Sequence, residues 1–242
     1  MEPSSSTDLV GSAQRLRRSF MLALSFASAL WLLKVADSLL DLQLVRFGIY
    51  PRTLEGLWGI LWAPWIHGSF AHAFANTGPI IVLGTALVYG YPRAARIALP
   101  AIYLGSGIGV WLFARSAYHI GASGLAFGMM FFVFTIGALR WDKRAIALSL
   151  IVFLLYGGMI WGIFPSAPDI SFEYHFFGAV VGVAMAVLLK NRDPAPPEKR
   201  YSWEDSDDEA DEWTELFPPE PGLEQTQPPK PPPDEAKPRR LH

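Results

Sequence analysis

The chain has 242 residues, of which 51% are hydrophobic and only 17% are charged, a balance too apolar for an ordinary soluble domain. Its net charge is −2 and it carries neither a broad basic surface nor a nucleic-acid motif, which excludes nucleic-acid binding as a function class. It has no cysteine, which excludes disulfides, a thiolate nucleophile and a thiolate metal site.

The N-terminal part predicts a polar segment followed by a membrane span. Residues 1–18 are polar and end in three arginines, and an apolar run extends from Phe20 to about Leu40. The basic region, the apolar run and the Ala-Ser-Ala sequence at 27–29 resemble a cleavable signal peptide. The run continues well past these small residues, which favours an uncleaved span. Lys34 and Asp37 lie one helical turn apart and are expected to form a structural ion pair.

Six membrane spans are predicted in a single helical domain covering residues 19–191. Residues 41–66 are too mixed to cross a membrane, and their tryptophans are typical of a segment that lies at the membrane surface. Each later apolar run is close to the roughly 20 residues that a spanning helix requires. These runs are residues 67–90, 97–114, 121–140, 145–164 and 172–190.

The composition changes completely near residue 191. Residues 192–242 are rich in proline, with an acidic block from Glu204 to Glu215, and such a segment cannot bury a core. We therefore expect a disordered C-terminal tail. Trp213, Leu216 and Phe217 indicate either a short docking motif for an unknown partner or simply part of a solvated spacer.

The distribution of basic residues predicts the orientation of the spans. Three basic residues lie near one membrane face and ten near the other, and cytoplasmic segments carry the excess of Lys and Arg. Both termini are therefore expected in the cytoplasm of a multi-pass protein of the bacterial plasma membrane. The three are Arg46, Arg52 and Arg115, and the ten are Arg15, Arg17, Arg18, Arg93, Arg96, Arg140, Lys143, Arg144, Lys190 and Arg192.

This orientation brings polar residues from three spans to the same depth. The second, fourth and sixth spans all begin at the outer face of the membrane. The second is predicted to begin with His67 and to carry His72 and Asn76 on one helix face, the fourth begins with Gly121-Ala122-Ser123-Gly124, and the sixth carries His175. Polar groups inside a membrane are costly, which favours a functional site.

The chemistry of these residues is that of nucleophilic catalysis. Ser123 at a helix N-terminus has free backbone N–H groups beside it, which suit a developing oxyanion. His175 can take the serine proton and return it to a leaving amine. His175, Gly178 and Gly182 share one helix face, and these glycines let the sixth span approach another helix, for which the fourth is the candidate. His72 and Asn76 are candidate hydrogen-bond donors to the oxyanion.

Other interpretations of the same residues remain open. Gly121-Ala122-Ser123-Gly124 also matches a helix-packing motif of small residues, and His67 and His119 are interpreted as structural hydrogen-bonding residues. A metal site built from His67, His72 and His175 is an alternative, although the spans contain no His-Glu-x-x-His pair. Glu173 is not assigned as a third catalytic member, because residues two apart on a helix do not face each other.

At this point the chain resembles a known family, the rhomboid intramembrane serine proteases. The resemblance rests on His67, His72 and Asn76, on Gly121 to Gly124, and on His175 with Gly178 and Gly182, and it covers roughly residues 20–190. It implies a Ser123–His175 dyad, a His72/Asn76 oxyanion hole, and no cofactor or metal. It also implies supporting roles for Gly121, Gly124, Phe127, Gly178, Gly182 and His67, with Phe127 standing where many members carry tyrosine.

The resemblance further implies the substrates, which are membrane proteins with a single helix that enter sideways between the second and fifth spans. Two other functions compete with proteolysis. A non-catalytic relative that escorts membrane helices would be expected to lack the serine or the histidine, and this chain keeps both. A small transporter or channel would be expected to carry a deep carboxylate relay, which no span contains.

Overall fold

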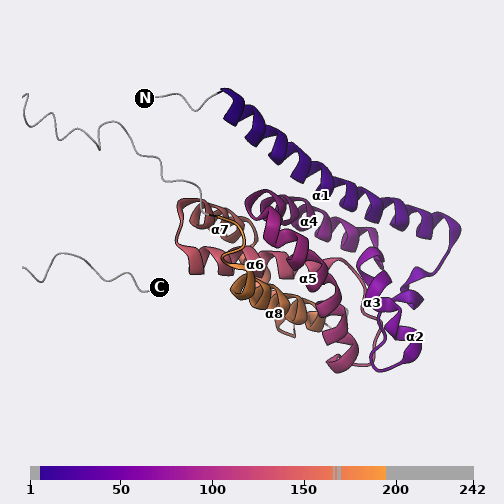
Figure 1. The fold of residues 1–242 in the computed structure, drawn as a ribbon. Coiled ribbons are helices and arrows are strands. Elements are labelled where there is room, and N and C mark those ends of the chain that lie inside the picture. The colour runs from indigo at the N-terminus through magenta and orange to yellow at the C-terminus, as the bar shows by residue number, and fades with distance from the viewer. Residues whose placement is uncertain (1–5, 166, 168–169, 195–242) are drawn as a thin grey trace, which may run out of the picture. The chain divides into compact units, whose positions relative to one another are not determined.

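The computed structural model describes residues 6–165, 167 and 170–194, with side chains from Val10 onward. The prediction of an all-α membrane protein with six spans is confirmed: within these residues, six helical segments are long and apolar enough to cross a bilayer. They are α1 (Ser6–Leu40), α4 (Phe70–Gly90), α5 (Pro92–Phe113), α6 (Ser123–Arg140), α7 (Lys143–Tyr156) continued by the 3-10 helix η3 (Gly157–Ile163), and α8 (Phe172–Leu189) (Figure 1).

The second span begins three residues later than predicted. Helix α4 starts at Phe70 because the Ser69 hydroxyl accepts a hydrogen bond from the His72 backbone N–H at 3.0 Å and caps the first turn. His67 therefore lies in the loop before the helix, and the expectation that the span opens at His67 is wrong. His72 and Asn76 remain on one helix, one turn apart.

Two helices begin earlier than the hydropathy of the sequence indicates. Helix α5 starts at Pro92 rather than residue 97, because proline at the first helical position needs no N–H partner and has a suitable φ. Helix α1 starts at Ser6, well before the apolar run at Phe20. The polar segment in between includes three arginines, two leucines, an alanine and a glutamine, which are good helix formers.

The fifth span changes its helix type near its end. Residues 145–164 were expected to form one continuous span, but the α-helical part ends at Tyr156 and η3 continues it as a 3-10 helix. Gly157, the residue that follows the last α-helical residue, disfavours the α-helix at this point, and short 3-10 segments commonly follow α-helical ends. As a result, the backbone carbonyl groups of η3 point in directions that differ from those of a regular α-helix.

Helix α6 is the central helix, and it packs closely against α8. Most residues of α6 (61%) are buried, whereas only 6% of the residues in the most apolar stretch of the fifth span are buried. A Cβ atom added to Gly178 would lie 2.1 Å from the carbonyl oxygen of Gly124, and one added to Gly182 would lie 2.2 Å from that of Gly128. The predicted close approach of the fourth and sixth spans is therefore present, and the two helices run parallel with their N-termini together.

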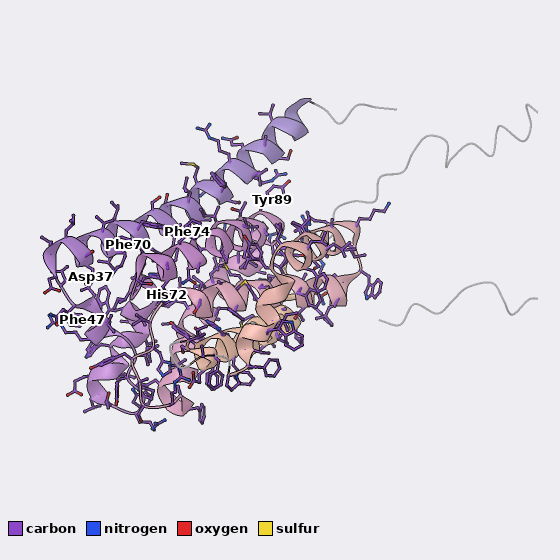
Figure 2. All side chains as sticks on the ribbon, turned by 180° about the vertical axis from the view of Figure 1, so that it is seen from behind. Asp37, Phe47, Phe70, His72, Phe74 and Tyr89 are labelled. Atoms are coloured by element: carbon purple, nitrogen blue, oxygen red, sulfur yellow. The ribbon has the colours of Figure 1, made fainter. Side chains whose placement is uncertain are left out.

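Helix α1 lies along α4 at the edge of the bundle (Figure 1). The Trp31 indole N–H donates to the Thr77 hydroxyl at 2.8 Å, which fixes one helix against the other. The predicted pair forms near the end of α1, where Lys34 Nζ lies 2.9 Å from Asp37 Oδ2. The other oxygen of Asp37 accepts from the Leu44 backbone N–H at 3.0 Å and so holds the chain as it leaves the helix (Figure 2).

The tryptophan-rich segment consists of helical turns too short to span a membrane, as predicted. They are η1 (Leu44–Phe47), α2 (Leu54–Leu57), α3 (Gly59–Trp62) and η2 (Ala63–Trp65). Trp58 and Trp62 are exposed, whereas Trp65 turns inward and donates from its indole to the Tyr103 hydroxyl at 2.9 Å. The location of this segment at a membrane surface stays a prediction.

The chain after α8 folds back onto the membrane domain before the described part ends. Asp193 is buried, and its two carboxylate oxygens accept from the backbone N–H groups of Arg93 and Ala94, both at 2.9 Å. Residues 192–194, which the composition assigned to the tail, thus cap the N-terminus of α5. The expectation of disorder for the rest of the tail lies outside the described residues.

Candidate active site

Ser123 is the first residue of α6, and its side chain is half-buried. The turn before it depends on Gly121, whose φ of 104° is a conformation that residues with a side chain rarely adopt. The Gly121 N–H donates to the Ala63 carbonyl at 2.8 Å, which ties this turn to the tryptophan-rich segment. Because no side chain caps the helix, the first N–H groups of α6 point out beside Ser123.

His72 and Asn76 reach the same turn from α4. A Cβ atom on Gly121 would lie only 2.6 Å from His72 Nε2, so glycine leaves room for the imidazole, and it would lie in ordinary contact, 3.8 Å, with Asn76 Nδ2. The Asn76 amide donates one N–H to the His72 carbonyl at 3.1 Å, which leaves its second N–H for another acceptor. Figure 2 labels His72, which lies in the first turn of α4. The side chains of His72 and Asn76 thus lie beside Gly121, two residues before Ser123 and next to the N-terminus of α6.

The imidazole of His175 is held on two sides. Its ring stacks on Phe127 of α6, with centroids 4.1 Å apart and planes only 6° from parallel. Its Nδ1 lies 2.8 Å from the carbonyl oxygen of Gly162 in η3. A carbonyl only accepts hydrogen bonds, so Nδ1 carries the proton and the neutral ring has its lone pair on Nε2.

Ser123 and His175 lie on the facing helices α6 and α8. Ser123 and Phe127 are four residues apart and share a face of α6, so the ring that stacks on Phe127 lies on the serine side of the helix. A direct hydrogen bond between the two side chains is not among those that the described residues make. In enzymes without substrate such contacts are often long and tighten only when substrate binds.

Two other histidines support the turn around Ser123. His67 Nε2 accepts weakly from the Ala122 N–H at 3.5 Å, and burial lowers the pKa of His67 to about 4. His119 is also buried: its Nε2–H donates to the Arg115 carbonyl at 3.0 Å, and its Nδ1 lies 2.6 Å from the Ser171 hydroxyl. Burial also lowers the pKa of His119. Both rings are therefore neutral near pH 7.

Glu173, the acidic residue near His175 in the sequence, is bound by another residue. The carboxylate of Glu173 lies 3.7 Å from the Arg115 guanidinium and accepts from the Arg115 backbone N–H at 3.4 Å. It is thus engaged by Arg115 rather than by His175. Within the described part of the chain, no group of three His, Asp or Glu side chains is arranged to hold a metal ion.

Sequence reasoning missed the residues that act through their backbone or over long separations. Gly162 contributes a carbonyl oxygen, and Ala63 does the same for Gly121; neither residue type signals such a role. Ser171 caps α8 by accepting from the Tyr174 N–H, and it also contacts His119, 52 residues earlier in the chain. A serine just before an apolar run is a recognisable capping signal, but its long-range partner is not visible in the sequence.

The fold and the site define a multi-pass helical membrane protein with a serine and a histidine on facing helices. Residues 54–192 match the model of the Rhomboid domain. The chain is 35% identical over 175 residues to the uncharacterized protein Rv1337 of Mycobacterium tuberculosis, covering 69% of this chain and 73% of that protein.

Two further relatives are more distant. Uncharacterized protein ML1171 of Mycobacterium leprae is 31% identical over 178 residues, which is 69% of each chain. RHOMBOID-like protein 2 of Arabidopsis thaliana is 26% identical over 154 residues, 62% of this chain and 45% of that protein. The chain therefore belongs to the rhomboid family, which is known for serine intramembrane proteases.

Proposed function

We propose that this protein is an intramembrane serine protease that hydrolyses peptide bonds in or near the membrane-spanning segments of other proteins. The observation that carries the proposal is the state of His175. Its ring is stacked on α6 just below Ser123, and its Nδ1 is bound to a carbonyl, so its basic Nε2 is unprotonated. A base in this state, beside a serine at a helix N-terminus, is the minimum that serine catalysis requires.

In the proposed reaction, His175 Nε2 takes the hydroxyl proton of Ser123 as Oγ attacks the scissile carbonyl carbon. The negative charge moves to the carbonyl oxygen, which accepts hydrogen bonds from the Ser123 backbone N–H and from the side chains of His72 and Asn76. The imidazolium then gives its proton to the amide nitrogen, the C–N bond breaks, and an ester remains on Ser123. Water, deprotonated by the same histidine, hydrolyses that ester and restores the serine.

The proposed substrates are membrane proteins with a single spanning helix. Family membership supports this substrate class, and so does the depth of the site, which lies at the N-terminal ends of two spanning helices. The bilayer is then the medium through which a substrate reaches the site, between α4 and the fifth span.

Cleavage of a tagged membrane-helix substrate by purified protein tests the proposal. We expect cleavage by the wild type and none by Ser123→Ala or His175→Ala. Because nucleophile and base act together, the double variant should be no worse than either single one. A fluorophosphonate should label the wild type, should fail to label Ser123→Ala, and should label His175→Ala slowly.

Two results would overturn the serine mechanism. One is normal cleavage by a folded Ser123→Ala protein. The other is strong inhibition by a chelator that zinc reverses, because it would favour a metal site at the histidines. If the wild type neither cleaves nor takes up the label, but binds membrane helices, the protein is a non-catalytic member of the family.

We further propose that both termini are cytoplasmic and that the site opens toward the outer side of a bacterial plasma membrane. The excess of basic residues on the side of the termini supports this orientation. A reporter fused to the C-terminus should be active only in a cytoplasmic form, and one inserted near Ser166 should be active only outside. If both reporters give the same side, the proposed orientation is wrong.

A further inference from the structure

A main-chain carbonyl, rather than a carboxylate, contacts the candidate base. His175 Nδ1 lies 2.8 Å from the carbonyl oxygen of Gly162, a normal length for an N–H···O bond. Glu173, the acidic residue nearest to His175 in sequence, is engaged by Arg115 instead. The group that fixes the ring thus belongs to the backbone of η3, at the end of the fifth span.

The position of this carbonyl depends on residue 162 having no side chain. A Cβ atom there would lie 2.7 Å from Phe127 Cζ and 3.3 Å from His175 Nδ1. Those two rings are stacked on each other, so neither can move aside without disturbing the pair. A methyl group at 162 must therefore shift either the stacked rings or the backbone of η3, and each shift changes the hydrogen bond to Nδ1.

Another glycine of the same segment provides a contrast. Gly158 also lies in η3, but a Cβ atom at this position would have no atom within 4 Å. The two positions share the same short 3-10 helix and the same intrinsic cost of replacing glycine. They differ in what surrounds them, so a comparison of the two isolates the contact with His175.

We propose that the Gly162 carbonyl is the positioning group of the base: it keeps the proton of His175 on Nδ1 and the lone pair on Nε2, facing α6. The inference rests on the proposed serine-protease function and adds η3 to the catalytic unit. A carbonyl is uncharged, so it fixes the tautomer and the ring orientation without adding a buried negative charge. The third position of a catalytic triad is thus occupied here by a backbone oxygen.

Kinetics of Gly162→Ala, with Gly158→Ala as the matched control, test this role in the full-length protein. The net value of one hydrogen bond corresponds to roughly a tenfold change in rate, so Gly162→Ala should lower kcat about tenfold with KM nearly unchanged. Labelling by a fluorophosphonate should slow in parallel. Gly158→Ala should match the wild type in kcat, KM and labelling.

A rescue variant shows whether Gly162→Ala acts through its steric contact with Phe127 or by unfolding the protein. Leucine at 127 lacks the ring atom that the new methyl group would meet, so it makes room for an alanine at 162. Adding Gly162→Ala to Phe127→Leu should then cost less than adding it to the wild type. A cost that is the same in both backgrounds would contradict the steric part of the proposal.

The tautomer itself is measured by ¹⁵N NMR of the histidine-labelled protein, with the His175 signals assigned from a His175→Gln variant. We expect a protonated Nδ1 and an unprotonated Nε2 in the wild type, and a mixture of tautomers in Gly162→Ala. A wild-type proton on Nε2, or an active Gly162→Ala protein with unchanged kcat, would overturn the proposal while leaving the protease function intact. A wild type without serine-dependent cleavage would overturn both.

Discussion

The two ends of the α6–α8 pair carry different kinds of polar group. At the N-terminal ends the candidate reactive side chains are neutral: Ser123 and His175 on the two helices, with His72 contributed by α4, and all three are only partly buried. One ion pair, between Arg115 and Glu173, lies at the same end. At the C-terminal ends the polar groups are charged, and they bind one another or the backbone. The same two helices thus carry a candidate reactive site at one end and a network of charged side chains at the other.

The charged end is an ionic clamp formed by Tyr91, Arg140, Asp142, Arg144 and Asp193. Arg140 Nε lies 2.7 Å from Asp142 Oδ2, and the Arg140 guanidinium also donates to the Asp193 carbonyl at 2.7 Å. The two arginines lie 5.9 and 6.0 Å from the Tyr91 ring, within the range of cation–π contacts. Burial raises the pKa of Tyr91 to about 12, so the phenol stays neutral beneath them.

The difference between the two ends separates stability from reactivity. The charged groups of the clamp bind one another and the backbone, and these contacts stabilise the fold. At the other end, Ser123, His72 and the second N–H of Asn76 keep donor capacity, which costs stability and is the usual condition of active sites. Substitutions at the site end should therefore lower the rate, and substitutions in the clamp should lower the free energy of unfolding.

The largest effect within this comparison is expected at the proposed oxyanion donors. Asn76→Ala and His72→Ala should each lower kcat/KM by about 10²–10³, because each removes one donor while the others remain. Cleavage of a model substrate measures both variants. Their thermal midpoints should stay near that of the wild type.

Thr77 provides the matched control for Asn76. It is the next residue on α4, but its hydroxyl contacts Trp31 of α1 rather than the site. Thr77→Val should lower stability by about 1 kcal/mol through the lost hydrogen bond, with kcat/KM almost unchanged. Equal losses of activity in Thr77→Val and Asn76→Ala would contradict the proposal that Asn76 acts on the substrate whereas Thr77 only holds two helices together.

A smaller effect is expected where His119 meets Ser171. His119 is four residues before Ser123, and Ser171 is four residues before His175. Their 2.6 Å contact therefore connects the two segments that lead into the candidate catalytic residues. Ser171→Ala also loses the cap of α8 and should lower kcat about tenfold and stability by about 1–2 kcal/mol. Ser171→Thr keeps the hydroxyl and should stay close to the wild type in both assays.

A double-mutant cycle with His119→Ala shows whether the two side chains act through each other. If they do, His119→Ala combined with Ser171→Ala should cost little more than the worse single variant. Fully additive losses would mean that Ser171 acts only as a helix cap.

The six spans were predictable because a bilayer imposes strong rules on length and composition. Their ends were not, because helix ends depend on local groups. Ser69 starts α4 after His67, Pro92 starts α5 early, and Gly157 ends α7. Hydropathy is averaged over many residues, so it does not detect the effect of a single capping hydroxyl.

The side chains of the candidate site were predictable for a similar reason. Ser123, His72, Asn76 and His175 are polar residues in apolar surroundings, and their spacing is visible in the sequence. The Gly162 carbonyl was not, because every residue has a carbonyl and only the 3-10 geometry of η3 directs this one at His175. Asp193 lay beyond the last apolar run, so its composition assigned it to the tail.

Substitutions in the ionic clamp should lower stability and leave activity unchanged, the opposite of substitutions at the site. Asp193→Ala removes the carboxylate that accepts from two N–H groups of α5 and should lower the free energy of unfolding by about 1–2 kcal/mol. Below the melting range, kcat/KM should stay within about twofold of the wild type. Asn191→Ala, two residues earlier and exposed, is the control and should change neither quantity. A hundredfold loss of activity in Asp193→Ala at unchanged stability would show that the two ends are coupled.

The smallest effect is expected from removal of the tail, provided that the cut spares the clamp. A chain ending after Pro194 keeps Asp193 and also the Pro194 carbonyl that accepts from Arg144 at 3.0 Å. Its turnover and melting midpoint should match those of the full-length protein within about twofold and a few degrees. A chain ending only two residues earlier, after Arg192, loses the carboxylate and should be destabilised at least as much as Asp193→Ala, with its activity retained at low temperature. If the cut after Pro194 instead abolished cleavage, the acidic proline-rich segment would have to act on the site itself. The separation between a reactive end and a stabilising end would then not describe the whole protein.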